Sequence, residues 1–167
     1  LKNRGFAWDL ILVNMPEPSS GESNRFYTRE FFALCAARLY SGGIVAVRLP
    51  TAENLWTPQT LHRTASVHRA LSAVFPEVLV LPGSMTVISA SAAPLPRSPE
   101  ILNDRLRERE IQARLVSPPY IRFLYTNDRF GDGENRLKNA SVPENSDIRP
   151  VCYPYAVVSW LARFFPG

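Results

Sequence analysis

The stretch WDLILVNMPEP, residues 8 to 18, decides the predicted fold of this chain. Its first seven residues form a nearly continuous apolar run, which is typical of a strand covered on both faces in a parallel sheet. The strand then opens into a proline-rich loop that carries Asn14, Glu17 and, a little further on, Glu22. A catalytic base at such a strand end would ordinarily be a carboxylate, whereas the first polar side chain here is an amide.

Strand and helix patterns alternate beyond this loop. Thr28 is a plausible cap for a helix, which we expect to stop at the SGG of residues 41 to 43. The run GIVAVRLP predicts a second strand, and Pro58 suits the first turn of a second helix. Two β-rich runs follow, residues 78–81 and 85–90, and the intervening Pro-Gly-Ser predicts an antiparallel hairpin.

This order of elements predicts an α/β fold, with a parallel sheet, helices on its faces and one closing antiparallel strand. Residues 1–93 would form this unit, and residues 94–167 a helical and loop-like carboxyl-terminal extension that packs on it. Within the extension, we expect a solvated amphipathic helix over residues 100–116 and a polar loop over residues 127–147.

The amino-acid composition and residue spacing argue against several classes of function. The 167 residues suit one domain, and the net charge of +4 comes from arginines spread along the chain, which does not favour nucleic-acid binding. Cys35 and Cys152 lie far apart, and His62 and His68 are six residues apart, so no metal-ligand spacing occurs. Residues 155–161 form too short an apolar stretch to span a membrane, and we expect the chain as given to be soluble.

The carboxyl ends of the first two strands are the best candidate for a site, because ligands of open α/β sheets bind there. Residues 14–21 follow the first strand, and Glu53 and Trp56 follow the second. Glu17 could anchor an ammonium group, and Asn14 could donate or accept a hydrogen bond. An ordinary βα turn explains the same residues, and the sequence alone leaves both interpretations open. The chain contains no Gly-x-Ser-x-Gly, Gly-x-Gly-x-x-Gly or P-loop motif.

The order of N-M-P-E-P, FYTREFF, SGGIVAVRLP and VFPEVLVLPG, with the tail NSDIRPVCYPYAVVSW, resembles the carboxyl-terminal half of the spermidine synthase (polyamine aminopropyltransferase) catalytic domain. The resemblance is to bacterial proteins in which this domain is joined to membrane-spanning segments, and it implies a cytoplasmic domain of an inner-membrane protein. It also implies a partial class I methyltransferase-like Rossmann fold, with residues 9–13 as an unpaired edge strand. Such an edge invites self-association, so we expect a homo-oligomer.

The resemblance implies roles for the loop residues. Aminopropyltransferases move a propylamine group from decarboxylated S-adenosylmethionine to a diamine, using an Asp-x-x-Asp-Pro motif at this strand end. Asn14 stands at the position of the first Asp, which helps to deprotonate the amine, and Glu17 and Pro18 stand at the second Asp and the proline. Glu22 could supply another carboxylate, because an amide cannot act as the base. Glu53 and Trp56 would line the same substrate site.

The resemblance places the cofactor loop in the first half of the domain, so we expect this chain by itself to bind no cofactor and to be inactive. Two other functions stay open for the intact protein. The same sheet serves methyltransferases that use S-adenosylmethionine, and an asparagine at this strand end suits them. A domain that kept the scaffold and lost the chemistry would be a ligand-binding or interaction domain.

Overall fold

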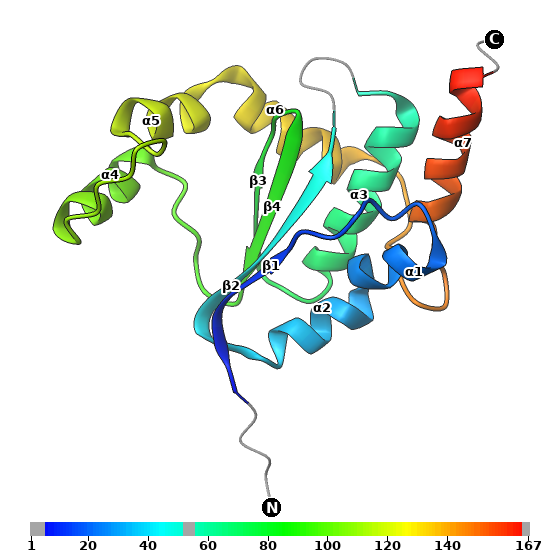
Figure 1. Ribbon diagram of the computed structural model, residues 1–167, viewed down its shortest axis with the longest axis horizontal. Helices are drawn as coiled ribbons and strands as arrows, with labels where there is room; N and C mark the ends of the chain where they lie inside the picture. Colours follow the sequence, from blue (N-terminus) through cyan, green and yellow to red (C-terminus); the bar gives the residue numbers. More distant parts are fainter. Residues whose placement is uncertain (1–5, 52–55, 165–167) are drawn as a thin grey trace, which may run out of the picture.

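The computed structural model describes residues 6–51 and 56–164, which form one sheet and the helices around it (Figure 1). The strands are β1 (Trp8–Val13), β2 (Leu39–Pro50), β3 (Glu77–Leu81) and β4 (Met85–Ser91). The helices are α1 (Gly21–Asn24), α2 (Arg29–Ala36), α3 (Pro58–Ser72), α4 (Pro99–Glu108), α5 (Pro118–Thr126), α6 (Asp128–Asn139) and α7 (Cys152–Phe164), with a 3-10 turn over Arg25–Tyr27.

The strands lie in the order β1-β2-β4-β3. β1 is parallel to β2, and β4 is antiparallel to both β2 and β3. This arrangement confirms the predicted α/β fold with its closing antiparallel hairpin. Because β1 and β2 are parallel, their carboxyl ends, and the loops that follow them, meet at one edge of the sheet.

The predicted helix starts are confirmed, but the predicted end of the first helix is wrong. Thr28 and Thr57 cap α2 and α3 by accepting hydrogen bonds from backbone amides. α2 ends at Ala36, and the SGG stretch lies inside β2. A Cβ at Gly43 would come within 2.9 Å of the Trp8 carbonyl oxygen, so this glycine allows β2 to approach β1 closely.

One face of the sheet carries the core. Val45, Val47 and Leu49 of β2 and Ile88 of β4 have no exposed surface. They pack in a cluster with residues of α2, α3 and α6. α3 in turn contacts α2, α6 and α7, and its residues 63–71 are buried with the exception of Arg69.

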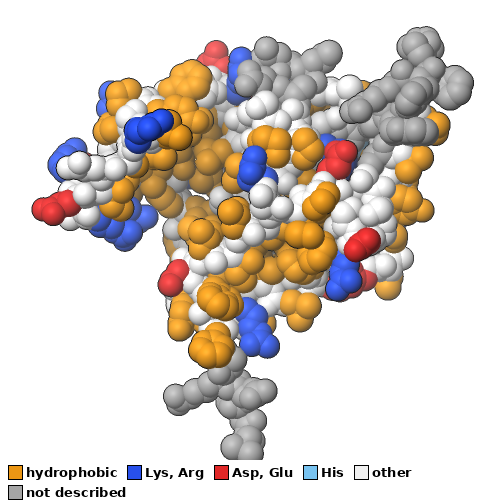
Figure 2. Space-filling view, in the orientation of Figure 1, with side chains coloured by type: hydrophobic (Ala, Val, Ile, Leu, Met, Phe, Trp, Pro, Cys, Tyr) orange, Lys and Arg blue, Asp and Glu red, His pale blue; other side chains and the backbone are white. Residues whose placement is uncertain are grey.

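The other face is open at β1. Leu10 and Leu12 are 57% and 58% exposed, so the prediction that this strand is covered on both faces is wrong for the described residues. Hydrophobic side chains gather on the near face of the molecule, over the region where Figure 1 draws β1 (Figure 2). Within the described part of the chain, β1 pairs only with β2 and is an edge strand, as predicted.

Beyond residue 94, one predicted helix is present but too long, and one predicted loop is wrong. The expected helix over residues 100–116 ends at Glu108, and α4 and α5 form an arm that stands away from the sheet (Figure 1). The expected polar loop over residues 127–147 contains α6, whose Leu137 is fully buried. Phe130 and Leu137 are the only large apolar residues in the polar sequence of α6, and tertiary packing on α3 and β3 stabilises this helix.

Candidate functional site

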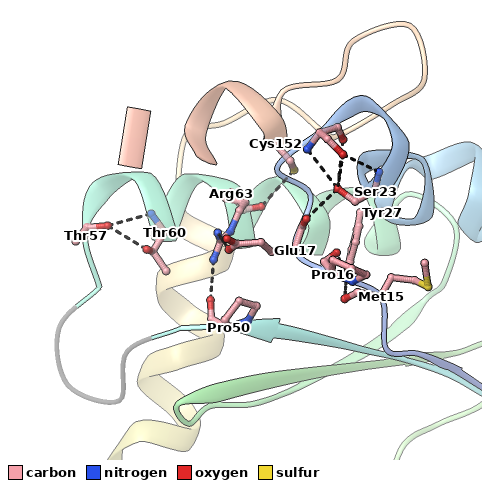
Figure 3. A network of polar contacts seen from close by, with 11 residues as sticks. Met15, Pro16, Glu17, Ser23, Tyr27, Pro50, Thr57, Thr60, Arg63 and Cys152 are labelled. Carbon is pink, nitrogen blue, oxygen red and sulfur yellow. Dashed lines mark hydrogen bonds and ion pairs between the residues drawn. The ribbon is translucent and has the colours of Figure 1, made fainter. Parts of the chain in front are cut away.

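The loop after β1 is fixed by hydrogen bonds to its backbone (Figure 3). The buried Tyr27 hydroxyl donates to the carbonyl oxygens of Met15 and Pro16, at 2.8 and 3.0 Å. Ser23 Oγ donates to the Glu17 carbonyl oxygen at 2.9 Å. Burial raises the pKa of Tyr27 to about 12, so this side chain stays a neutral donor at physiological pH. The loop is therefore a preorganised element of the strand end.

Glu17 forms an ion pair with Arg63 of α3 (Figure 3). Arg63 Nη1 donates to Glu17 Oε2, and Arg63 Nη2 donates to the Pro50 carbonyl oxygen at 2.7 Å. The Arg63 side chain is 8% exposed and that of Glu17 41% exposed. This guanidinium ties the loop after β1 to the end of β2, and the carboxylate at the predicted amine-anchor position already has a cationic partner.

Asn14 is bonded to a different arginine. Its Oδ1 accepts a hydrogen bond from Arg48 Nη1 at 3.1 Å. Val47 and Leu49, the neighbours of Arg48 in β2, are fully buried on the side of α3, so Arg48 lies on the opposite, open face of the sheet. Asn14 and Glu17 are thus paired with two separate guanidinium groups on opposite sides of the strand ends.

The other predicted site residues lie at or near this edge. Glu22 is exposed in the first turn of α1. Pro18 is buried, and Trp56 is half-buried and packs against the hydrophobic core. Glu53 lies outside the described residues. Among the described residues that the sequence singled out, Pro18 and Trp56 are thus packing residues, and Asn14, Glu17 and Glu22 are the polar ones.

Sequence reasoning missed Arg48 and Arg63. The sequence pattern could have identified Arg48, because it is the single charged residue in the strand run GIVAVRLP. No sequence pattern identifies Arg63, because it lies among polar residues of α3. Only the packing of neighbouring elements around this helix makes it a buried group.

The described residues contain no metal site. None of their His, Cys, Asp and Glu side chains form a cluster that could hold a metal ion. Gly42 and Gly43 lie within β2 and Gly133 packs against Pro82, so these three glycines serve chain packing. Burial raises the pKa of the Cys35 and Cys152 thiols to about 11 and about 12, which makes both unreactive core groups.

The comparisons with known proteins are partial. No protein-family model matches the chain. Over 66 residues the chain is 36% identical to a polyamine aminopropyltransferase of Corynebacterium efficiens, a stretch that is 40% of this chain and 12% of that protein. The chain therefore spans a small part of the curated relative that it matches.

A solved structure shows the fold. The crystal structure of human methyltransferase-like protein 13 in complex with SAH superposes with a TM-score of 0.50 at 19% identity, covering 71% of this chain and 55% of that chain. The expectation of a methyltransferase-like Rossmann fold is thereby confirmed. Among the described residues, no helix has the length and apolar character needed to cross a membrane.

Proposed function

We propose that this chain forms the acceptor side of a group-transfer domain that uses an S-adenosylmethionine-type cofactor, and that the group transferred is aminopropyl. One observation carries the proposal: the loop N-M-P-E-P is fixed at the carboxyl end of β1, in a methyltransferase-like fold whose sequence is similar over 66 residues to a polyamine aminopropyltransferase. The cofactor, in its decarboxylated form, would be held by residues other than those described.

The described residues would bind and orient the amine. Asn14 Oδ1 accepts a hydrogen bond from Arg48 and has a second lone pair, which can accept from an N–H of the substrate amine. An amide cannot take the proton of the attacking amine, and Glu17 is paired with Arg63. The proton would therefore pass to another carboxylate, such as the exposed Glu22, or to water. The missing base should make the reaction slow.

The test is a transfer assay on the longest natural form of the protein that contains this chain. Wild type and Asn14→Asp are incubated with decarboxylated or ordinary S-adenosylmethionine and a panel of amines. We expect aminopropylated product, and an increase of roughly 10-fold to 100-fold in rate for Asn14→Asp. A carboxylate restores a base, and pairing with Arg48 keeps the gain at the lower end of the ~10²–10⁴-fold that a positioned base contributes. Methylated product would overturn this proposal and show that the protein is a methyltransferase.

A non-catalytic ligand-binding domain is the second candidate. It is favoured by the hydrogen bonds that already engage both Asn14 and Glu17 with arginine side chains. In that case calorimetry should detect binding of an amine while neither cofactor gives a product, with wild type or with Asn14→Asp. Product formation by the wild type would exclude this candidate.

A further inference from the structure

The two arginines at the strand ends have unequal partners. Arg63 is neutralised by the carboxylate of Glu17. Arg48 is bonded to the uncharged amide of Asn14, and it makes no ion pair with the described residues. The site thus contains one paired cation on the side of α3 and one unpaired cation on the open face.

Glu17 is poorly placed to bind an ammonium group. Its Oε2 accepts a hydrogen bond from Arg63, whose side chain is 8% exposed, so a buried guanidinium already neutralises this carboxylate. A cationic amine can reach Oε1, because the Glu17 side chain is 41% exposed, but it meets a pair with no net charge that includes another cation. A substrate that carries only positive charges therefore gains little from this carboxylate.

Arg48 is well placed to bind an anion. A guanidinium has five N–H donors in a planar fork, and the hydrogen bond from Nη1 to Asn14 uses one of them. The remaining donors match the two oxygens of a carboxylate, which is the preferred partner of arginine. The side chain is half-buried and lies on the same face of the sheet as the exposed Leu12 of β1, so a ligand on the open face can reach it in the described structure.

We propose that the acceptor is an amine that also carries a carboxylate, and that Arg48 binds this carboxylate while Asn14 positions the guanidinium. The proposal rests on the proposed function for the identity of the site as an acceptor site. It adds the class of substrate: an amino-acid-like amine in place of a simple diamine.

Two ligands that differ only in the carboxylate test the proposal. Binding of 1,4-diaminobutane and of 2,5-diaminopentanoate, the same diamine with a carboxylate, is measured by calorimetry on the longest natural form of the protein. We expect the carboxylated amine to bind about tenfold more tightly or better, as for a hydrogen bond to a charged group. Equal affinity, or tighter binding of 1,4-diaminobutane, would overturn the proposal.

Variants assign the preference to Arg48. Arg48→Gln should reduce the affinity ratio to about one, and Arg48→Lys should keep part of it because the charge remains. Arg69→Gln is the matched control, since Arg69 is exposed on α3 and donates to the Ala140 carbonyl oxygen. A ratio unchanged in Arg48→Gln would contradict the proposal. If this variant does not fold by circular dichroism, the ratio in Arg48→Lys decides: an undiminished ratio overturns the proposal.

The outcomes separate this inference from the proposed function. Aminopropyl transfer to 1,4-diaminobutane but not to 2,5-diaminopentanoate would keep the proposed function and overturn the inference. Conversely, a carboxylate preference that depends on Arg48 in a protein that transfers no group would keep the inference about the ligand class and overturn the proposed reaction.

Discussion

The two faces of the sheet are built from similar apolar residues, yet their surroundings differ. On one face Val45 and Val47 are fully buried beneath α2 and α3, while on the other Leu10 and Leu12 are more than half exposed. Apolar composition alone therefore does not decide which side of a strand is covered. The covered face carries the stability of the fold, and the open face offers the surface on which ligands or partners can bind.

The largest effect should come from the covered face. Leu71→Ala removes a fully buried side chain of α3 and should lower the free energy of unfolding by about 2–5 kcal/mol, since it creates a cavity in the core. Leu12→Ala is the matched control and should cost below about 1 kcal/mol because Leu12 is 58% exposed. Urea unfolding of both variants measures the difference. Equal losses would show that β1 is covered on both faces in solution.

A buried histidine on the covered face predicts that the free energy of unfolding decreases at acid pH. His68 of α3 is 4% exposed with no hydrogen-bond partner for either ring nitrogen, and desolvation lowers its pKa to about 4. Glu134 raises this pKa, whereas Lys138 and Arg69 lower it. Because the unfolded histidine has a pKa of about 6.5, the unfolded state binds more protons between pH 6.5 and 4. Stability should therefore be constant above about pH 6.5 and fall as the pH drops toward 4.

Urea unfolding at pH 7 and pH 4.5 measures this effect, which should amount to about 2–3 kcal/mol. His68→Leu should lose this part of the pH dependence. His62→Leu, at a partly exposed position of the same helix, should keep it. A wild-type protein with the same stability at both pH values would contradict the buried, neutral state of His68.

Much of the fold could be predicted from sequence because local signals and packing agree there. The helix cap at Thr28, the first-turn position of Pro58 and the Pro-Gly-Ser turn of the hairpin act within a few residues of chain. The features that the sequence did not predict share one cause. The end of α2, the helix α6 and the burial of Arg63 depend on contacts between segments far apart in sequence.

The candidate site also has features that the sequence predicts and features that it does not. The loop position after β1 was predicted correctly from the strand pattern and the order of the elements, because parallel strand ends must meet. The partners of Asn14 and Glu17 could not be predicted, since each lies on another element, at Arg48 and Arg63. The chemistry of the loop depends on those partners as much as on the loop itself.

Breaking the ion pair at the strand ends should have an intermediate effect. Glu17→Gln leaves Arg63 buried without its counter-ion, and we expect a loss of about 1–3 kcal/mol in the free energy of unfolding. Glu22→Gln is the control, because Glu22 is exposed. Chemical unfolding at low and high salt measures the free energy of unfolding of both variants. A loss no larger than that of the control would mean that the pair does not fix the loop.

The smallest effect on stability should come from the open face, although its effect on association can be large. Leu12→Lys replaces a side chain that is 58% exposed, so the free energy of unfolding should change by less than about 0.5 kcal/mol. If the edge strand β1 mediates the self-association expected from the sequence, a lysine there should suppress it, because charges on an edge oppose strand pairing. Leu115→Lys, at a 78% exposed position between α4 and α5, should leave association unchanged. Light scattering over a concentration series distinguishes these outcomes. A wild-type protein that stays monomeric throughout would show that the open face is not a contact between copies of the chain.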